Sequence, residues 1–131
     1  QAYAAEFNKY NVPKKVTFLD AFLIVCVERP TQPIFNCEPM VYGDFVKHNN
    51  NAGVVRERES ERNTPQAFSH FSHWFSKGQY IIVDIQGVGD TYTDPQVHSF
   101  NKTGFGIGNL GQDGMDKFFA THRCNNICVG L

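Results

Sequence analysis

The sequence predicts a mixed α+β fold. Three segments carry aromatic side chains at the spacing of one helix face, and two others are rich in the apolar and β-branched residues typical of strands. Turns containing proline or glycine separate these segments. The chain has 131 residues, of which 41% are hydrophobic and 12 are phenylalanine. That is enough apolar material for the core of one domain, or of one lobe of a larger domain.

The N-terminal part is predicted to be a helix followed by a β-hairpin. Residues 2–10 carry three aromatic side chains at positions i, i+4 and i+7, and Pro13 ends the helix. Residues 16–28 are rich in Val, Ile, Leu and Phe, which predicts a buried strand. A turn containing two prolines then leads into a second short strand at 34–37.

A loop and a helix are predicted next. Residues 42–63 have no clear period, and the charged run at 56–62 within them is expected to form a solvated surface. A helix is predicted from Asn63 to about Phe75, because Asn63 can cap its first turn and Pro65 is tolerated there.

The C-terminal half begins with a strongly apolar segment. Residues 79–88 predict a buried strand, and residues 91–111 are glycine-rich and predict a long irregular segment. Aromatic and apolar side chains on one side of residues 113–122 predict the last helix.

Composition and charge exclude several classes of function. The net charge is −1 and no basic stripe is present, so nucleic acid is not expected as a partner. No run of 18 apolar residues occurs, so we expect no membrane segment. Cys26 and Cys37 stand singly in apolar surroundings and are expected to be buried free thiols. Such cysteine usage favours a reducing compartment and hence a cytoplasmic protein.

Three oxygen-bearing side chains gather near the end of the strand at 79–88. Asp84 and Gln86 are two apart, a spacing that places both on one face of a strand, and Asp94 follows after a short loop. A buried carboxylate is costly unless it is paired or holds a metal. Two carboxylates and an amide oxygen suit Mg²⁺, which prefers oxygen ligands. Asp84 alone could equally cap a turn.

A closely spaced group of His122, Cys124 and Cys128 follows the last predicted helix. One imidazole and two thiolates supply three of the four ligands of a structural zinc site. The fourth could be His70 or His73 from the earlier helix. The alternatives are a histidine at a helix end with two core cysteines, or a Cys124–Cys128 disulfide.

The remaining motifs are weak by themselves. Residues 106–111 fit G-x-G-x-x-G, but no strand precedes them directly and no acidic residue follows at the usual distance. We therefore reject a dinucleotide-binding site and interpret these residues as a glycine-rich loop with backbone angles that other residues rarely adopt. Lys47 considered alone is an ordinary surface charge.

Taken together in order, these segments resemble the alpha-type (atypical) serine/threonine protein kinases. The resemblance covers nearly the whole chain. It is carried by the helix start Asn63–Phe71, the strand and loop at 83–88 and 92–96, the glycine-rich loop at 106–111, the tail His122–Cys128, and the segments at 6–11 and 13–15.

The resemblance implies a role for each matched position. Asp84 would be the catalytic aspartate, Gln86 and Asp94 would hold Mg²⁺, and Lys47 and Asn49 would lie close to the ATP phosphates or the metal. The adenine would hydrogen-bond to the backbone carbonyl of Glu38 and to the backbone amide of Met40 or Val41. A structural Zn²⁺ would be bound by His70, in preference to His73, with His122, Cys124 and Cys128. The loop containing Gly108, Asn109 and Gly111 would help to place the protein substrate.

The resemblance also implies an incomplete domain. Residues 1–131 would comprise the end of the N-terminal lobe, the hinge and the C-terminal lobe of an atypical protein-kinase-like fold with a structural zinc site. The function implied is phosphoryl transfer from Mg-ATP to Ser or Thr of a protein. The alternative is a truncated, catalytically silent, zinc-stabilised binding lobe, because the upstream strands and their nucleotide-contacting lysine are missing.

Overall fold

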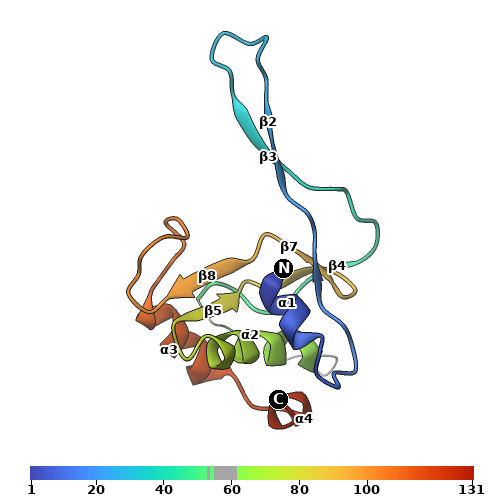
Figure 1. The fold of residues 1–131 in the computed structure, drawn as a ribbon, viewed down its shortest axis with the longest axis vertical. Helices are drawn as coiled ribbons and strands as arrows, with labels where there is room; N and C mark the ends of the chain where they lie inside the picture. The colour runs from blue at the N-terminus through green and yellow to red at the C-terminus, as the bar shows by residue number, and fades with distance from the viewer. Residues whose placement is uncertain (53, 55–61) are drawn as a thin grey trace.

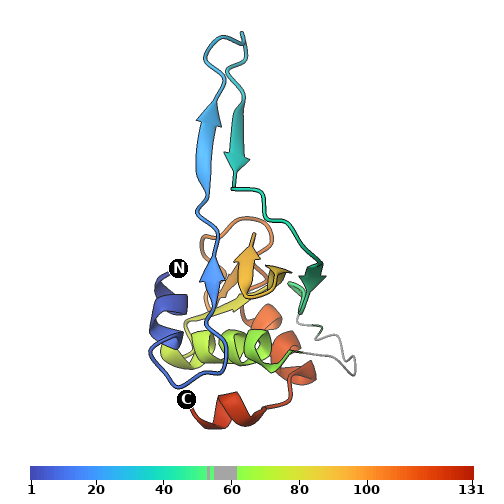
Figure 2. The same ribbon diagram turned by 90° about the vertical axis from the view of Figure 1, so that its right-hand side faces the viewer.

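The structure, a computed structural model, describes residues 1–52, 54 and 62–131. It consists of a body and a long arm that projects away from it, as both views show (Figures 1 and 2). The body holds the helices and most of the strands, and the arm is one β-hairpin. The fold is mixed α+β, as the sequence predicts. The charged run expected at 56–62 lies outside the described residues, apart from Arg62.

A four-stranded sheet in the order β1-β7-β6-β4 forms part of the body. Its strands are β1 (Thr17–Phe18), β4 (Phe45–Lys47), β6 (Gln86–Val88) and β7 (Thr91–Thr93). β6 pairs antiparallel with both β4 and β7, whereas β1 pairs parallel with β7. A separate antiparallel pair joins β5 (Tyr80–Val83) to β8 (Gln96–Ser99).

These short strands correct three predictions. The loop predicted at 42–63 contains β4, and the irregular segment predicted at 91–111 contains β7 and β8. The single strand predicted at 79–88 is two strands, because the backbone at Asp84 adopts φ +59° and ends the extended run. β4 pairs with β6, far along the chain, so no local pattern marks β4. β6 and β7 instead pair with each other across a short turn.

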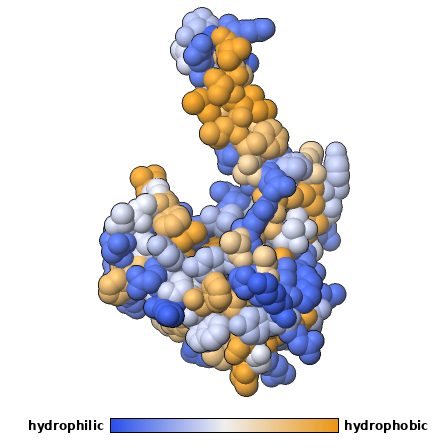
Figure 3. All heavy atoms as spheres, viewed as in Figure 1, coloured by the Kyte–Doolittle hydropathy of each residue, from blue (hydrophilic) through white to orange (hydrophobic). Residues whose placement is uncertain are grey.

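The arm consists of β2 (Phe22–Val25) and β3 (Ile34–Cys37), which pair antiparallel as the hairpin prediction requires. The single strand predicted at 16–28 is two strands, β1 and β2. The expected burial holds for Val16 and Phe18 but is wrong for β2, whose four residues are exposed. Cys26 and Cys37 are half-buried free thiols rather than core residues. Apolar side chains gather over the middle of the visible face of the arm, and hydrophilic ones lie at its tip (Figure 3). An exposed apolar patch of this kind is typical of a surface that another segment or protein covers.

The main core lies between α1 (Ala2–Phe7) and α2 (Asn63–Phe75). The α1 helix ends at Phe7, three residues short of the predicted end. The Phe7 ring packs edge-on against Phe68 and Phe71 at centroid distances of 5.5 and 5.4 Å. The α2 bounds match the prediction, but Arg62 occupies the N-cap position and no side chain caps the helix. The aromatic face of α2 thus fixes the helix by packing rather than by capping.

The last two helices complete the body. α3 (Gln112–Thr121) buries Met115 and Phe118 against Ile81 and Val83 of β5. α4 (Asn126–Val129) packs against α2 and is capped by Asn125. Within the described part of the chain, no helix is long and apolar enough to cross a membrane.

Candidate functional site

Lys47, Asp84 and Gln86 meet where β4 pairs with β6. The register places Lys47 opposite Gln86, and Asp84 lies two residues before Gln86 at the strand break. The Lys47 Nζ atom is 2.5 Å from Asp84 Oδ1. That oxygen is buried and accepts no hydrogen bond of ordinary geometry from the described residues, so the ammonium group acts on it as a point charge. The carboxylate is thereby held beside a cation at the edge of the sheet.

Asp84 holds its position partly through Asn49. The Asn49 Oδ1 atom accepts a hydrogen bond of 2.9 Å from the backbone N–H of Ile85. The Asn49 Nδ2 atom donates to Gln66 Oε1 at 3.0 Å and to Ser69 Oγ at 3.1 Å, both on α2. The side chain is 1% exposed. Asn49 therefore ties the strand break to α2, and its expected place close to the ATP phosphates or the metal stays a prediction.

Gln86 brings Asp84 and Asp94 together. Its Nε2 atom donates to Asp84 Oδ2 at 3.3 Å and to the backbone carbonyl of Asp94 at 3.4 Å. Asp84, Gln86 and the backbone of Asp94 thus lie together, and a metal site formed by their side-chain oxygens stays a prediction. Asp84 and Gln86 do not lie on one continuous strand as expected, whereas the expected short loop does return Asp94 beside Gln86. The tight β6–β7 turn brings the loop of Asp94 back beside Gln86.

The predicted hinge residues differ in their surroundings. Glu38 accepts a hydrogen bond from the Thr93 hydroxyl and lines a cavity of about 240 Å³ together with Phe18, Tyr92 and Asp94. Met40 and Val41 are exposed and are not among the described residues that line this cavity. An adenine contact at their backbone amides stays a prediction.

The glycine-rich loop is organised by Asn109, which is 3% exposed. Its Oδ1 accepts from the N–H groups of Ser99 and Gly111 at 3.1 and 3.0 Å, and its Nδ2 donates to Ser99 Oγ and the Gly104 carbonyl. A Cβ atom at Gly108 would lie 2.1 Å from Gln96 Oε1, so this position admits only glycine without a shift. The side chain of Ile107, which sequence reasoning did not single out, is fully exposed beside them.

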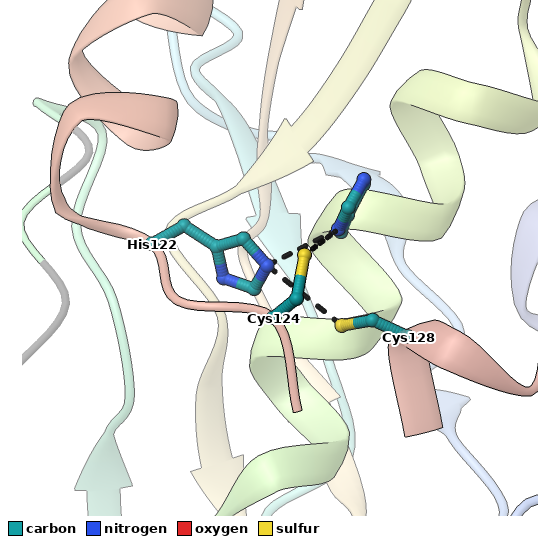
Figure 4. A group of neighbouring side chains, drawn as sticks. His122, Cys124 and Cys128 are labelled. Atoms are coloured by element: carbon teal, nitrogen blue, oxygen red, sulfur yellow. Dashed lines mark hydrogen bonds between the residues drawn. The ribbon is translucent and has the colours of Figure 1, made fainter. Parts of the chain in front are cut away.

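His70, His122, Cys124 and Cys128 form a compact group whose ligand atoms all lie within 4.8 Å of one another. The structure selects His70 over His73, whose ring packs against Phe119. His70 Nδ1 lies 3.1 Å from His122 Nε2 and 3.5 Å from Cys124 Sγ, and Cys128 Sγ lies 3.7 Å from His122 Nε2. Figure 4 shows the three labelled side chains pointing toward one another.

The electrostatics of this group suit neutral imidazoles. Burial, the neighbouring His70 and the charge of Arg123 lower the pKa of His122 to about 4. Burial lowers the pKa of His70 as well and raises the pKa of the Cys128 thiol. The structure shows no disulfide between Cys124 and Cys128, which both remain thiols. A neutral imidazole is the form that binds a metal.

Known proteins provide an independent comparison. The model of the alpha-kinase family matches residues 1–128. The chain is 50% identical over 130 residues to myosin heavy chain kinase B of Dictyostelium discoideum, covering 98% of this chain and 18% of that protein. It is 48% identical over 129 residues to human eukaryotic elongation factor 2 kinase, again covering 98% of this chain and 18% of that protein.

Solved structures agree with the sequence matches. The alpha-kinase domain of myosin heavy chain kinase A in complex with ADP superposes with a TM-score of 0.92 at 44% identity, covering 98% of this chain and 52% of that one. A D756A form of that domain, described as inactive, was solved with ATP and gives a TM-score of 0.89. The chain thus spans about half of these solved domains and about a fifth of the curated relatives named above. From its sequence and its fold, this chain belongs to the alpha-kinase family.

Proposed function

We propose that this chain supplies the catalytic lobe of a kinase that transfers the γ-phosphoryl group of Mg-ATP to serine or threonine of a protein. The observation that carries the proposal is the meeting of Lys47, Asp84, Gln86 and Asp94 at one edge of the sheet. Phosphoryl transfer asks a protein mainly for positioning and charge stabilisation, and these residues offer both. That solved relatives bind ADP and ATP supports a nucleotide site.

Asp84 is the proposed catalytic residue. Its carboxylate would accept a hydrogen bond from the substrate hydroxyl and align that oxygen with the γ-phosphorus. Lys47 orients the carboxylate, since the Nζ atom contacts the same oxygen that receives no ordinary hydrogen bond. The two roles require the backbone at Asp84 to keep its φ of +59°, which Asn49 supports through Ile85.

Gln86 and Asp94 are the proposed ligands of Mg²⁺. Their carboxylate and amide oxygens are hard donors of the kind this ion prefers. In the present arrangement the Gln86 amide points its N–H group at Asp84. A half-turn of the amide exchanges its nitrogen and oxygen, so the same position can offer an oxygen ligand. When bound, the ion would neutralise charge on the ATP phosphates.

The His70, His122, Cys124 and Cys128 group is the proposed structural zinc site. Four ligand atoms held about 2.0–2.3 Å from zinc in a tetrahedron lie roughly 3.3–3.8 Å apart. The three distances of 3.1, 3.5 and 3.7 Å within the group are close to that spacing. The donor set therefore fits zinc. Because it joins α2 to the segment after α3 and to α4, a zinc ion there would stabilise the packing of these helices.

The second candidate is a catalytically silent binding lobe. It is favoured by the exposed apolar arm, which offers a surface to a binding partner. In the kinase proposal, residues 1–131 comprise the end of the N-terminal lobe, the hinge and the C-terminal lobe. The segment that completes the domain would then cover the arm.

The test is phosphoryl transfer by the full-length gene product. The protein is incubated with Mg-ATP labelled at the γ-phosphate and with an acceptor protein, and phosphoserine and phosphothreonine are measured. We expect transfer by the wild type, loss of at least about a hundredfold in Asp84→Asn, and unchanged transfer in Asp113→Asn, an exposed carboxylate on α3. Absence of transfer from folded, zinc-loaded wild-type protein would favour the silent lobe. Retention of transfer in Asp84→Asn would reject the catalytic role of Asp84.

A further inference from the structure

His98 on β8 is a fully buried histidine that connects two loops. Its Nε2 atom lies 2.8 Å from the backbone carbonyl oxygen of Asn51, and its Nδ1 atom lies 3.1 Å from the backbone nitrogen of Leu110. The ring also lies against α3 at Gly114, where a Cβ atom would come within 2.3 Å of Cδ2. The glycine at that position therefore provides the space that the imidazole occupies.

The partners of the ring fix its tautomer. The Leu110 backbone N–H can only donate, so His98 Nδ1 must accept and carries no proton. The Asn51 carbonyl can only accept, so His98 Nε2 must carry the proton. Burial lowers the pKa of His98, the hydrogen bond to Asn51 opposes this, and the charge of Lys117 lowers the pKa further. The neutral ring with its proton on Nε2 makes both hydrogen bonds, to the Asn51 carbonyl and from the Leu110 N–H, at the same time.

The two loops come from different parts of the chain. Asn51 belongs to the segment after β4, and with Lys47 and Asn49 it lines a polar cavity of about 390 Å³. Leu110 belongs to the glycine-rich loop, next to the organising side chain of Asn109. β8 itself pairs with β5, the strand that ends at Val83, one residue before Asp84. One imidazole thus contacts the backbone of both loops from a strand whose partner strand precedes the proposed catalytic residue.

We propose that His98 is a positioning residue that holds the segment of Asn51 and the glycine-rich loop in a fixed relation to each other. It does so through one donated and one accepted hydrogen bond to backbone atoms. The inference rests on the proposed function in one respect, that the Asn51 segment faces ATP and the glycine-rich loop faces the protein substrate. The link between the two loops stands apart from that assignment, and the two can be tested separately.

The first experiment reads the tautomer in the wild-type protein. Long-range proton–nitrogen NMR spectra of the full chain, labelled with nitrogen-15 at histidine, distinguish a protonated from an unprotonated ring nitrogen. We expect His98 to show an unprotonated Nδ1 and a protonated Nε2 at pH 7. A proton on Nδ1, or an even mixture of tautomers, would overturn the proposal. This result requires neither a variant nor kinase activity.

The second experiment separates the two hydrogen bonds. His98→Gln places an amide N–H near the former Nε2 and keeps the bond to Asn51, whereas His98→Asn places an amide oxygen near the former Nδ1 and keeps the bond from Leu110. Loss of one buried hydrogen bond corresponds to roughly a threefold to tenfold effect. We expect His98→Gln to raise the KM for the protein substrate by that factor, and His98→Asn to raise the KM for ATP.

The control is His73→Gln, since His73 packs against Phe119 and lies outside both loops. Amide hydrogen exchange of each variant provides a readout without catalysis: we expect faster exchange at 108–111 in His98→Gln and at 49–51 in His98→Asn. If the wild type transfers no phosphate, the proposed function fails while this exchange pattern still decides the role of His98. Equal changes at both loops in both variants, or no change in either, would overturn it. If neither variant folds, the wild-type tautomer decides.

Discussion

Replacing Asn49 by alanine tests whether its side chain supports the site or binds a ligand. The substitution removes an acceptor from the Ile85 N–H and two donated bonds to Gln66 and Ser69. Asn49 is only 1% exposed, so these hydrogen bonds are buried. Leaving a buried polar group without its partner costs about 1–3 kcal/mol. Water can enter the space and replace some of these hydrogen bonds. We therefore expect the free energy of unfolding to fall by about 3–5 kcal/mol in total.

That loss is a large share of the stability of a typical domain, about 5–15 kcal/mol. The assay is urea unfolding of the full chain, followed by circular dichroism, for the wild type and Asn49→Ala. The matched control is Asn101→Ala, because Asn101 is exposed and bonds only locally to Thr103 in the contacts described. We expect the control to stay within about 0.5 kcal/mol of wild type.

Two outcomes would refute the reasoning. An Asn49→Ala protein as stable as the wild type would show that the three hydrogen bonds contribute little. A protein of unchanged stability with a raised KM for ATP would identify Asn49 as a nucleotide contact instead. If the support role is correct, the loss of stability accompanies a fall in kcat, because Asp84 loses the backbone anchor at Ile85.

Three further predictions follow from the contacts above. Cys128→Ser should lower bound zinc from one equivalent to none by elemental analysis and lower stability by several kcal/mol, about the effect of breaking a structural zinc site; full zinc retention would contradict the site. Lys47→Met should reduce kcat at least about tenfold and lower the unfolding free energy by about 1–3 kcal/mol, because the buried Asp84 Oδ1 atom loses its cation; unchanged kcat would contradict the orienting role. Burial lowers the folded-state pKa of His48 and His98 below 6.5, so the unfolded chain binds more protons and the unfolding free energy should fall as the pH drops from 7 to 5, by up to about 1.4 kcal/mol per pH unit for each group; urea unfolding showing equal stability at both pH values would contradict this.

Local patterns in the sequence predict the elements whose partners lie close along the chain. The aromatic spacing of α2 predicts its bounds because one helix face packs into the core. The turn between β2 and β3 predicts their pairing, because the two strands follow one another in the chain. The His122, Cys124 and Cys128 spacing predicts three members of the metal-ligand group, and the family resemblance selects His70 as the fourth.

Other features depend on contacts that no local pattern contains. Apolar residues in β2 predict a buried strand, yet burial depends on a covering surface that the described residues do not provide. The break at Asp84 depends on a left-handed backbone conformation, which aspartate tolerates better than most residues. The support role of Asn49 depends on α2 and Ile85, which follow it in the chain. The family resemblance places Asn49 close to the nucleotide, but no local pattern indicates that its side chain also anchors Ile85.

The parallel pairing of β1 with β7 determines when the body can fold during protein synthesis. Thr17 pairs with Thr91 and Phe18 pairs with Tyr92, so β1 must wait for a strand made much later. At a translation rate of about 5–20 residues per second, the delay is on the order of 10 s. Among the described residues, β2 and β3 pair only with each other, so the hairpin can form while the ribosome is still translating the body. A nascent chain that stalls before Tyr92 would present the arm above a core that lacks Tyr92 and the partner strand of β1.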